Sequence, residues 1–138
     1  MKILLDTDVL LDVANGRERF GPESRTVLRW CQSSHHSTVL AWHTLSNLYY
    51  LLRPTKGDKE ARTFITGLLV FSEVAATSRE SARQALALAM HDFEDALQVA
   101  AATVADAQFI VTRNVRDYRG SPVPAITPHD FIRRFLST

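Results

Sequence analysis

Ile3-Leu4-Leu5-Asp6-Thr7-Asp8 is the stretch of sequence that decides the fold of this chain. A short apolar run that ends in an acidic residue is typical of a buried strand that delivers a carboxylate to the edge of a sheet. Residues 92–98 and 109–117 also combine carboxylates with apolar runs. Several carboxylates at one edge repel each other unless a cation lies between them. The sequence therefore predicts a divalent-metal site.

Strand and helix signals alternate along the 138 residues. Strands are predicted at 2–6, 38–41, 70–75, 108–111 and 124–126. Helices are predicted at 9–15, from Pro22 through Cys31, at 44–53, at 59–69, from the Ser78 cap through Ala89, at 92–104 and at 128–136. Residues 33–37, which include His35 and His36, are predicted to form a turn.

The boundaries of two helices depend on single residues. Thr7 or Asp8 is predicted to cap the helix at 9–15, and Pro54 is predicted to end the helix that begins at Thr44. Strands that alternate with helices indicate an α/β fold in which helices cover both faces of a parallel sheet. We therefore expect a single three-layer α/β/α domain over residues 1–138.

Composition excludes few classes of partner, because the net charge is only +1 and 46% of the residues are hydrophobic. Cys31 is the only cysteine, so a disulfide within the chain is excluded and a reducing, cytoplasmic location is expected. The apolar run after Met1 is too short for a membrane span. Arg113 and Arg116 lie in the third acidic segment, where they either contact a phosphate-bearing substrate or are solvated loop charges.

The three acidic segments are expected to converge in the folded chain. Asp6, Thr112 and Asn114 follow the ends of predicted strands, which is where parallel sheets bind ligands. Asp92 and Asp95 are three residues apart at a helix start and share one face. Carboxylate oxygens favour Mg²⁺ or Mn²⁺, which can polarise a phosphoryl oxygen and lower the pKa of an attacking water. His35 and His36 lack the partners of a zinc site.

The order and spacing of four segments resemble PIN-domain ribonucleases, specifically the VapC-type toxins of VapBC toxin–antitoxin pairs. The four segments are Leu4-Leu5-Asp6-Thr7-Asp8-Val9-Leu10-Leu11-Asp12, Thr44-Leu45-Ser46-Asn47-Leu48-Tyr49-Tyr50-Leu51-Leu52, Asp92-Phe93-Glu94-Asp95-Ala96-Leu97-Gln98 and Val111-Thr112-Arg113-Asn114-Val115-Arg116-Asp117-Tyr118. The resemblance covers essentially the whole chain. It implies a PIN-like, Rossmann-like fold with a central parallel sheet of about five strands.

The resemblance also implies a site and an activity. Asp6, Asp95 and Asp117 match acidic positions that bind Mg²⁺ or Mn²⁺, and Thr112 and Asn114 match positions that hold a ligand. The implied activity is endonucleolytic hydrolysis of single-stranded or loop RNA. Homodimer formation and inhibition by a cognate antitoxin are implied as well.

One position departs from the family pattern. Asn47 stands where the family usually has a glutamate, and an amide adds no negative charge and cannot act as a base. Metal affinity is therefore expected to fall, unless Asp92 adds the missing carboxylate one turn before Asp95. Asp8 is a second possible substitute, with helix capping as its alternative role.

Two other functions compete with the nuclease. The loss of the glutamate at Asn47 allows a degenerate PIN domain that binds RNA or a protein partner without cleaving it. Asp6-Thr7-Asp8 also matches the start of haloacid-dehalogenase-type phosphatases, but Leu10 and the absence of a well-placed lysine argue against that class. The sequence identifies neither the RNA target nor the number of bound metal ions.

Overall fold

The computed structural model describes residues 1–33 and 37–136, and its centre is a five-stranded sheet in which all neighbouring strands are parallel. The strand order is β3-β2-β1-β4-β5. The strands are β1 (Lys2–Leu5), β2 (Ser37–Leu40), β3 (Ser72–Val74), β4 (Phe109–Val111) and β5 (Ala125–Ile126). All five lie within or next to the predicted ranges, which confirms the α/β class. The predicted turn at His35 and His36 lies outside the described residues.

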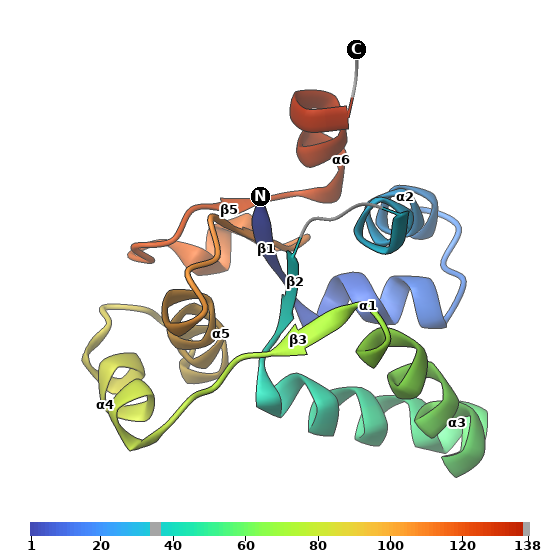
Figure 1. Cartoon of the computed structure of the whole chain (residues 1–138), viewed down its shortest axis with the longest axis horizontal. Coiled ribbons are helices and arrows are strands. Elements are labelled where there is room, and N and C mark those ends of the chain that lie inside the picture. Colours follow the sequence, from blue (N-terminus) through green and yellow to red (C-terminus); the bar gives the residue numbers. More distant parts are fainter. Residues whose placement is uncertain (34–36, 137–138) are drawn as a thin grey trace.

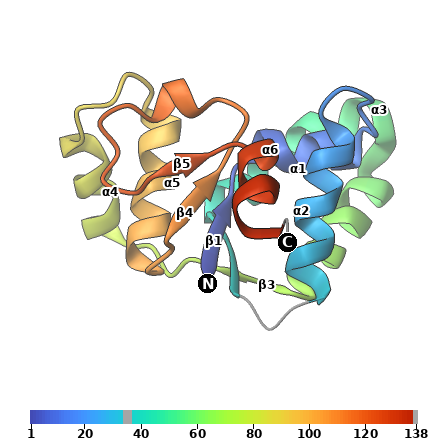
Figure 2. The same cartoon turned by 90° about the horizontal axis from the view of Figure 1, so that it is seen from above.

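Helices cover both faces of the sheet, as predicted (Figures 1 and 2). On one face lie α1 (Thr7–Ala14), α2 (Gly21–Ser33), α3 (Trp42–Leu69) and α6 (Pro128–Phe131), which continues as a short π-helix, Ile132–Leu136. On the other face lie α4 (Arg79–Ala87) and α5 (Phe93–Val104). The segment between β4 and β5 contains the 3-10 turn η1 (Val115–Tyr118).

Alternate side chains of the central strand supply both cores, because successive residues of a strand point to opposite faces. Ile3 and Leu5 pack with α1, α2, α3 and α6, whereas Leu4 packs with α5. The α5 side is built mainly from small side chains, including the buried Ala101 and Ala102. Small side chains let this helix lie close to β1 and β4, which brings its first turn near the edge of the sheet.

Two predicted helix boundaries are wrong. Asp6, rather than Thr7 or Asp8, is the N-cap of α1, because its extended backbone precedes the first helical residue and its carboxylate accepts the Thr7 backbone N–H. Pro54 lies inside α3, and the helical dihedrals are instead interrupted at Gly57 (φ 85°, ψ 165°). A proline keeps a φ that suits a helix, although it removes one hydrogen bond and its ring crowds the preceding turn, whereas this positive φ cannot belong to a right-handed helix.

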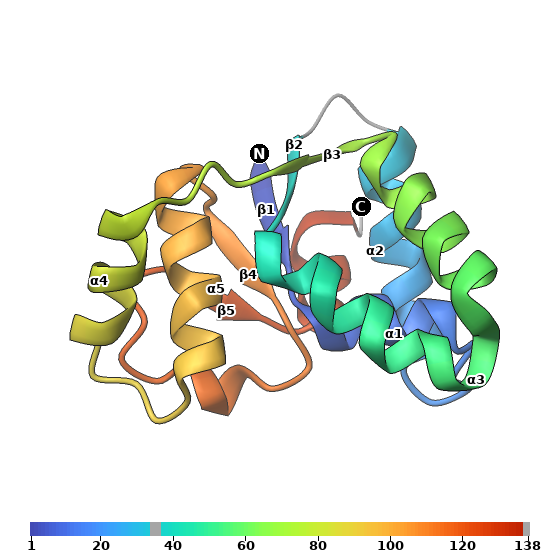
Figure 3. The same cartoon turned by 90° about the horizontal axis from the view of Figure 1, so that it is seen from below.

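The strand order reverses next to β1, and this position organises the site. The chain runs from β1 outward to β2 and β3, then returns through α4 and α5 to β4 on the other side of β1. In parallel sheets the ligand crevice lies at the carboxyl ends of strands at such a reversal. Figure 3 shows the starts of α1 and α3 on the side of the molecule where β1 and β2 end. Within residues 1–33 and 37–136, no helix is both long and apolar enough to cross a membrane.

Candidate metal centre

Asp6 lies at the carboxyl end of β1, and its buried carboxylate is held from three sides. Oδ1 accepts the Thr7 backbone N–H at 2.7 Å. Oδ2 accepts the Thr112 hydroxyl at 2.9 Å and the Tyr118 hydroxyl at 2.8 Å. Burial raises the pKa of Asp6, the two hydroxyl donors lower it, and the negative charge of Glu94 raises it again. The donors therefore fix one orientation of a carboxylate that burial alone would disfavour.

The start of α5 brings three more carboxylates together. Oxygen atoms of Asp92, Glu94 and Asp95 all lie within 4.8 Å of one another. Asp92 is the N-cap of the helix, and its Oδ1 accepts the Asp95 backbone N–H at 3.0 Å. Burial, followed by the contact with Glu94 and the charge of Asp6, raises the pKa of Asp95 to about 8. Without a cation, this carboxyl group therefore retains a proton at neutral pH.

The first two turns of α3 face this end of α5. His43 Nε2 lies 3.0 Å from Glu94 Oε1, and Asn47 Nδ2 donates to the same oxygen at 3.1 Å. The hydrogen bond with His43 is the main cause that lowers the pKa of Glu94. Gln98 is fully buried between the acidic groups, with Nε2 3.3 Å from Glu94 Oε1 and 3.4 Å from Asp6 Oδ1. Side chains of α3 and α5 thus join Asp6 in one polar network.

The loop after β4 is attached to the start of α1 through Asp8. Asp8 Oδ2 accepts the Thr112 hydroxyl at 3.2 Å, the Arg113 backbone N–H at 3.1 Å and the Asn114 side-chain amide at 2.9 Å. Burial and the neighbouring charge of Asp6 raise the pKa of Asp8 to about 7, although Arg113 opposes them. Thr112 therefore contacts both carboxylates of the Asp6-Thr7-Asp8 segment, and Asn114 contacts the second.

The remaining predicted residues lie around η1. Asp117 is exposed next to Tyr118, and its side chain makes no hydrogen bond or ion pair within the described part of the chain. Arg116 is exposed on the same turn. Arg113 is only 21% exposed, and its Nε lies 2.6 Å from Oδ2 of the buried Asp12. The Arg113 guanidinium also lies 4.4 Å from the centre of the Phe20 ring, so interactions within the protein already engage this cation.

The side chains of the network that received no role from the sequence include His43, Glu94, Gln98 and Tyr118. Glu94 and Gln98 are four residues apart in one helix and therefore share a face, a spacing that could have linked them. Tyr118 follows Asp117 directly, and nothing in the sequence indicates that its hydroxyl reaches Asp6. The contacts of Glu94 with α3 join residues about fifty positions apart, so only the folded chain reveals them.

The donor set fits a hard divalent cation. Carboxylate and amide oxygens are the ligands that Mg²⁺ and Mn²⁺ prefer. Two buried oxygens near the carboxylates, Asp8 Oδ1 and Gln98 Oε1, have no hydrogen-bond partner among the described residues. Asp95 and Glu94 are also in direct contact, an arrangement that needs either a shared proton or a cation. The site is thus acidic, partly desolvated and short of positive charge.

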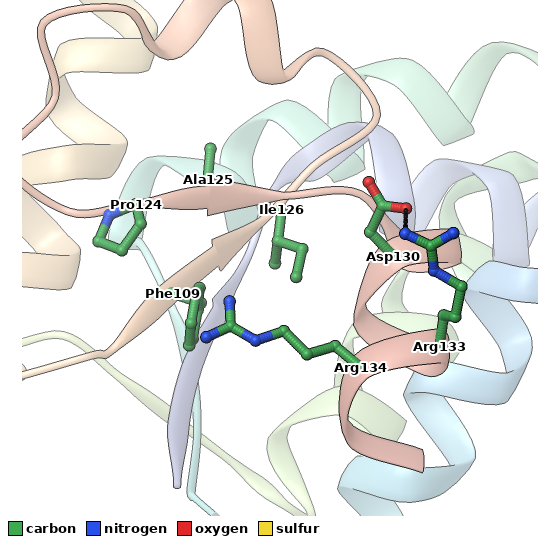
Figure 4. A pocket seen from close by; sticks show the side chains of 7 residues that line it. All are labelled: Phe109, Pro124, Ala125, Ile126, Asp130, Arg133 and Arg134. Atoms are coloured by element: carbon green, nitrogen blue, oxygen red, sulfur yellow. Dashed lines mark ion pairs between the residues drawn. The ribbon is translucent and has the colours of Figure 1, made fainter. Parts of the chain in front are cut away.

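A separate hollow of about 490 Å³ lies between β4, β5 and the C-terminal helix (Figure 4). Its charged side chains already have partners: Arg133 lies 3.8 Å from Asp130, and the Arg134 guanidinium lies 5.4 Å from the centre of the Phe109 ring. It contains one carboxylate among its lining residues, against the three that lie together at the start of α5. This hollow therefore offers fewer metal-binding groups than the carboxylates at the start of α5.

Comparisons with known proteins agree with this geometry. The sequence pattern of the PIN domain matches residues 2–116. A chain of the VapBC2 complex of Rickettsia felis, solved with a promoter DNA fragment, is similar in structure with a TM-score of 0.71 and 15% identity, covering 92% of this chain and 98% of that one. No protein with a curated description matches the sequence significantly.

Two further solved structures show the same fold. A chain of a toxin–antitoxin complex from Klebsiella pneumoniae has a TM-score of 0.69 and 21% identity, covering 91% of this chain and 97% of that one. VapC20 of Mycobacterium tuberculosis, a toxin that cleaves the sarcin–ricin loop, has a TM-score of 0.63 and 16% identity, covering 78% of this chain and 86% of that one. At these identities the likeness concerns the fold.

Proposed function

Because the chain belongs to the PIN domain family, we propose that it is a metal-dependent endoribonuclease and the toxin of a toxin–antitoxin pair. The observation that carries the proposal is that Gln98 joins Asp6, at the reversal of strand order, to Glu94 in the group of carboxylates at the start of α5. Carboxylates this close repel one another unless a proton or a cation is shared, and a cation held there suits phosphodiester hydrolysis. The proposed substrate is single-stranded or loop RNA.

The proposed roles of Asp6 and Asp95 follow from their positions, whereas that of Asp117 follows from the resemblance to the family. Asp6, Asp95 and Asp117 would hold Mg²⁺ or Mn²⁺, and Asp92 would add a carboxylate at the helix start. When bound, the cation would neutralise charge on the phosphoryl group and acidify the attacking water. Thr112 orients Asp6 through its hydroxyl.

The residues around the acidic group have supporting roles in this proposal. Asn114 holds Asp8, and thereby the loop after β4, in place. The exposed Arg116 would contact the RNA backbone. Arg113 was predicted for the same task, but its ion pair with Asp12 supports a role in ordering this loop. Asn47 would support the site through its bond to Glu94.

Cleavage of a mixed, structured RNA pool by the purified protein tests the activity. We expect cutting with Mn²⁺ or Mg²⁺, none with chelator, and a loss of about 10²-fold or more for Asp95→Asn, because the transition-state charge loses a major stabilising ligand. Asp106→Asn is the matched control, since Asp106 is exposed at the other end of α5 and its φ of 59° suits asparagine equally well.

Absence of cutting by a well-folded wild type would favour the degenerate alternative, in which the domain binds RNA or a partner without hydrolysis. The neutral side chain at Asn47 is the observation that favours this alternative. A stable, metal-independent RNA complex would then be its direct sign. Turnover of a chromogenic phosphate ester, with RNA left intact, would instead point to the phosphatase.

The contribution of Asp92 is tested separately. Asparagine is as good an N-cap as aspartate, so Asp92→Asn keeps the helix start and removes only the charge. We expect weaker Mn²⁺ binding in this variant if Asp92 is a ligand. Unchanged affinity, with binding abolished in Asp95→Asn, would leave Asp92 with its capping role alone.

The proposed partners are a cognate antitoxin and a second copy of the chain. Several solved structures with this fold are toxin–antitoxin complexes, which supports the first partner. Trp42 and Tyr50, exposed on α3 at 70% and 68%, offer apolar surface for an interface. Sedimentation of the purified chain tests the homodimer, and co-purification with a small neighbouring gene product tests the antitoxin.

A further inference from the structure

Glu94 belongs to the group of carboxylates at the start of α5, and the proposed function gives it no role. We propose that Glu94 is a ligand of the metal centre, and that Asn47 is a positioning residue that holds the Glu94 carboxylate toward Asp95. This inference rests on the proposed function and names which side chain completes its site. Position 47 of α3 is an asparagine and supplies no carboxylate. Under this proposal, Glu94 supplies one from the facing turn of α5.

The orientation of Glu94 is set by donors from two helices. His43 Nε2 at 3.0 Å and Asn47 Nδ2 at 3.1 Å approach Oε1 from α3, and Gln98 Nε2 approaches the same oxygen at 3.3 Å from within α5. Three donors on one oxygen leave the other oxygen of the carboxylate available. Side chains that donate to one oxygen of a metal-binding carboxylate orient it in this way.

The other side of Glu94 faces carboxylates. Its side chain contacts that of Asp95, and oxygens of Asp92, Glu94 and Asp95 lie within 4.8 Å of one another. Contact between two carboxylates is unfavourable unless a proton or a cation is shared. A purely structural ion pair with His43 would not require Glu94 to approach a second acidic group.

Gln98 provides an independent sign of a ligand. Its side chain is fully buried, and Nε2 reaches both Glu94 and Asp6, so the carboxamide lies between the two acidic groups. Its Oε1 has no partner in the part of the chain that the structure describes. An unpaired buried amide oxygen is costly, and it is a suitable ligand for a hard cation or for one of its waters.

The geometry of Asn47 makes an exchange of charge possible. Asn47 Nδ2 lies 3.1 Å from Glu94 Oε1, so a longer acidic side chain at position 47 reaches the same place from α3. Replacing Asn47 by Glu while replacing Glu94 by Gln moves one carboxylate across this contact and leaves the net charge unchanged. If the site needs a negative charge at this point, whichever helix carries it, the exchange restores Mn²⁺ binding. If the site needs an intact start of α5 instead, the exchange does not restore it.

The experiment measures Mn²⁺ binding from the decrease in the electron paramagnetic resonance signal of free Mn²⁺, and therefore needs no catalytic turnover. We expect Glu94→Gln to weaken binding by about tenfold to a hundredfold, and Asn47→Ala by about tenfold, as when groups that orient a metal ligand are removed. Glu80→Gln is the matched control, because Glu80 lies in the first turn of α4 and is exposed. Far-ultraviolet circular dichroism shows whether each variant is folded.

The double variant Asn47→Glu/Glu94→Gln decides between a ligand and a structural residue. We expect it to recover most of the affinity that Glu94→Gln loses. Wild-type affinity in Glu94→Gln, or a loss that the exchange does not restore at all, would overturn the role of Glu94 while Mn²⁺ binding by the wild type still supports the proposed function. A folded wild type that binds no Mn²⁺ would overturn both.

Discussion

The hydroxyl groups of Thr112 and Tyr118, which follow β4 in the sequence, hold the Asp6 carboxylate. Removing one hydroxyl tests how far the orientation of Asp6 depends on it. Tyr118→Phe removes the hydroxyl that donates to Oδ2 at 2.8 Å and preserves the buried ring. Thr112 still holds the same oxygen, so the fold should persist. We expect Mn²⁺ to bind about tenfold or more weakly, as when other groups that orient a metal ligand are removed.

The Tyr118→Phe result is read in a titration with Mn²⁺ under conditions where the variant is folded. Tyr50→Phe is the control, because it removes a tyrosine hydroxyl from a side chain that is 68% exposed on α3. Equal affinity in the wild type and in Tyr118→Phe would show that the Tyr118 hydroxyl is not needed to orient Asp6.

Asp95 links the stability of the metal-free protein to pH. Its pKa is about 8 in the folded chain, against an ordinary value of 3.8. Between these values the folded chain binds a proton that the unfolded chain releases, so the free energy of unfolding falls as pH rises. With chelator present, we expect the melting temperature to decrease from about pH 5 to pH 8.

Asp95→Asn should make this dependence less steep, because asparagine has no proton to lose, while the raised pKa values of Asp6 and Asp8 keep part of the slope. Asp106→Asn should keep the wild-type slope, since Asp106 is exposed at the far end of α5. Thermal unfolding monitored at several pH values measures the slopes. A melting temperature of Asp95→Asn that falls as steeply as that of the wild type would show that Asp95 is not the group responsible.

At the scale of elements, the breaks in helices and loops occur at glycines with positive φ rather than at proline. Gly57 (φ 85°) interrupts α3, and a Cβ added there would meet no atom within 4 Å. Gly120 (φ 88°) follows η1, and a Cβ added there would lie 2.6 Å from the Ala89 backbone oxygen. Replacing either glycine by alanine therefore costs free energy because of the positive φ, and at Gly120 the added Cβ would also clash with Ala89.

We expect Gly57→Ala to lower the free energy of unfolding by about 1–2 kcal/mol, the usual cost of placing a Cβ in a left-handed conformation. Gly120→Ala should cost more, because the loop must also move away from Ala89. Because η1 carries Tyr118, Gly120→Ala should weaken Mn²⁺ binding as well, whereas Gly57→Ala should not. Denaturant unfolding and the Mn²⁺ titration compare the two variants. Equal losses in the free energy of unfolding would show that the clash with Ala89 adds nothing at Gly120.

At the scale of the whole molecule, the site depends on how closely α5 lies against the sheet. Ala102 is fully buried and belongs to the small-residue core that joins α5 to β1 and β4. Ala102→Leu overpacks this layer, and we expect a loss of about 1–3 kcal/mol in the free energy of unfolding. The helix must shift to make room, so Mn²⁺ affinity should also fall.

Ala87→Leu is the control for overpacking, because Ala87 is exposed at the end of α4. Denaturant unfolding gives the stability and the Mn²⁺ titration gives the affinity. If Ala102→Leu loses stability but binds Mn²⁺ as tightly as the wild type, then the start of α5 is positioned by its polar contacts with α3 rather than by its packing.

The sequence alone determined the class of fold and the identity of the acidic segments. Period-two and helical spacings are local, so the strands, the order of helices and the caps at Ser78 and Asp92 follow from short stretches. Because parallel sheets bind ligands where the strand order reverses, Asp6 and the loop after β4 could also be expected to meet.

Only the tertiary structure decided which side chains complete the site. The contacts of Glu94 with His43 and Asn47, of Tyr118 with Asp6, and of Arg113 with Asp12 join residues far apart in the chain. Such contacts depend on how helices pack and rotate against the sheet, which periodicity leaves open. The sequence thus gives the charged residues, whereas packing decides which of them meet, because hydrogen bonds and ion pairs form only at distances of a few ångströms.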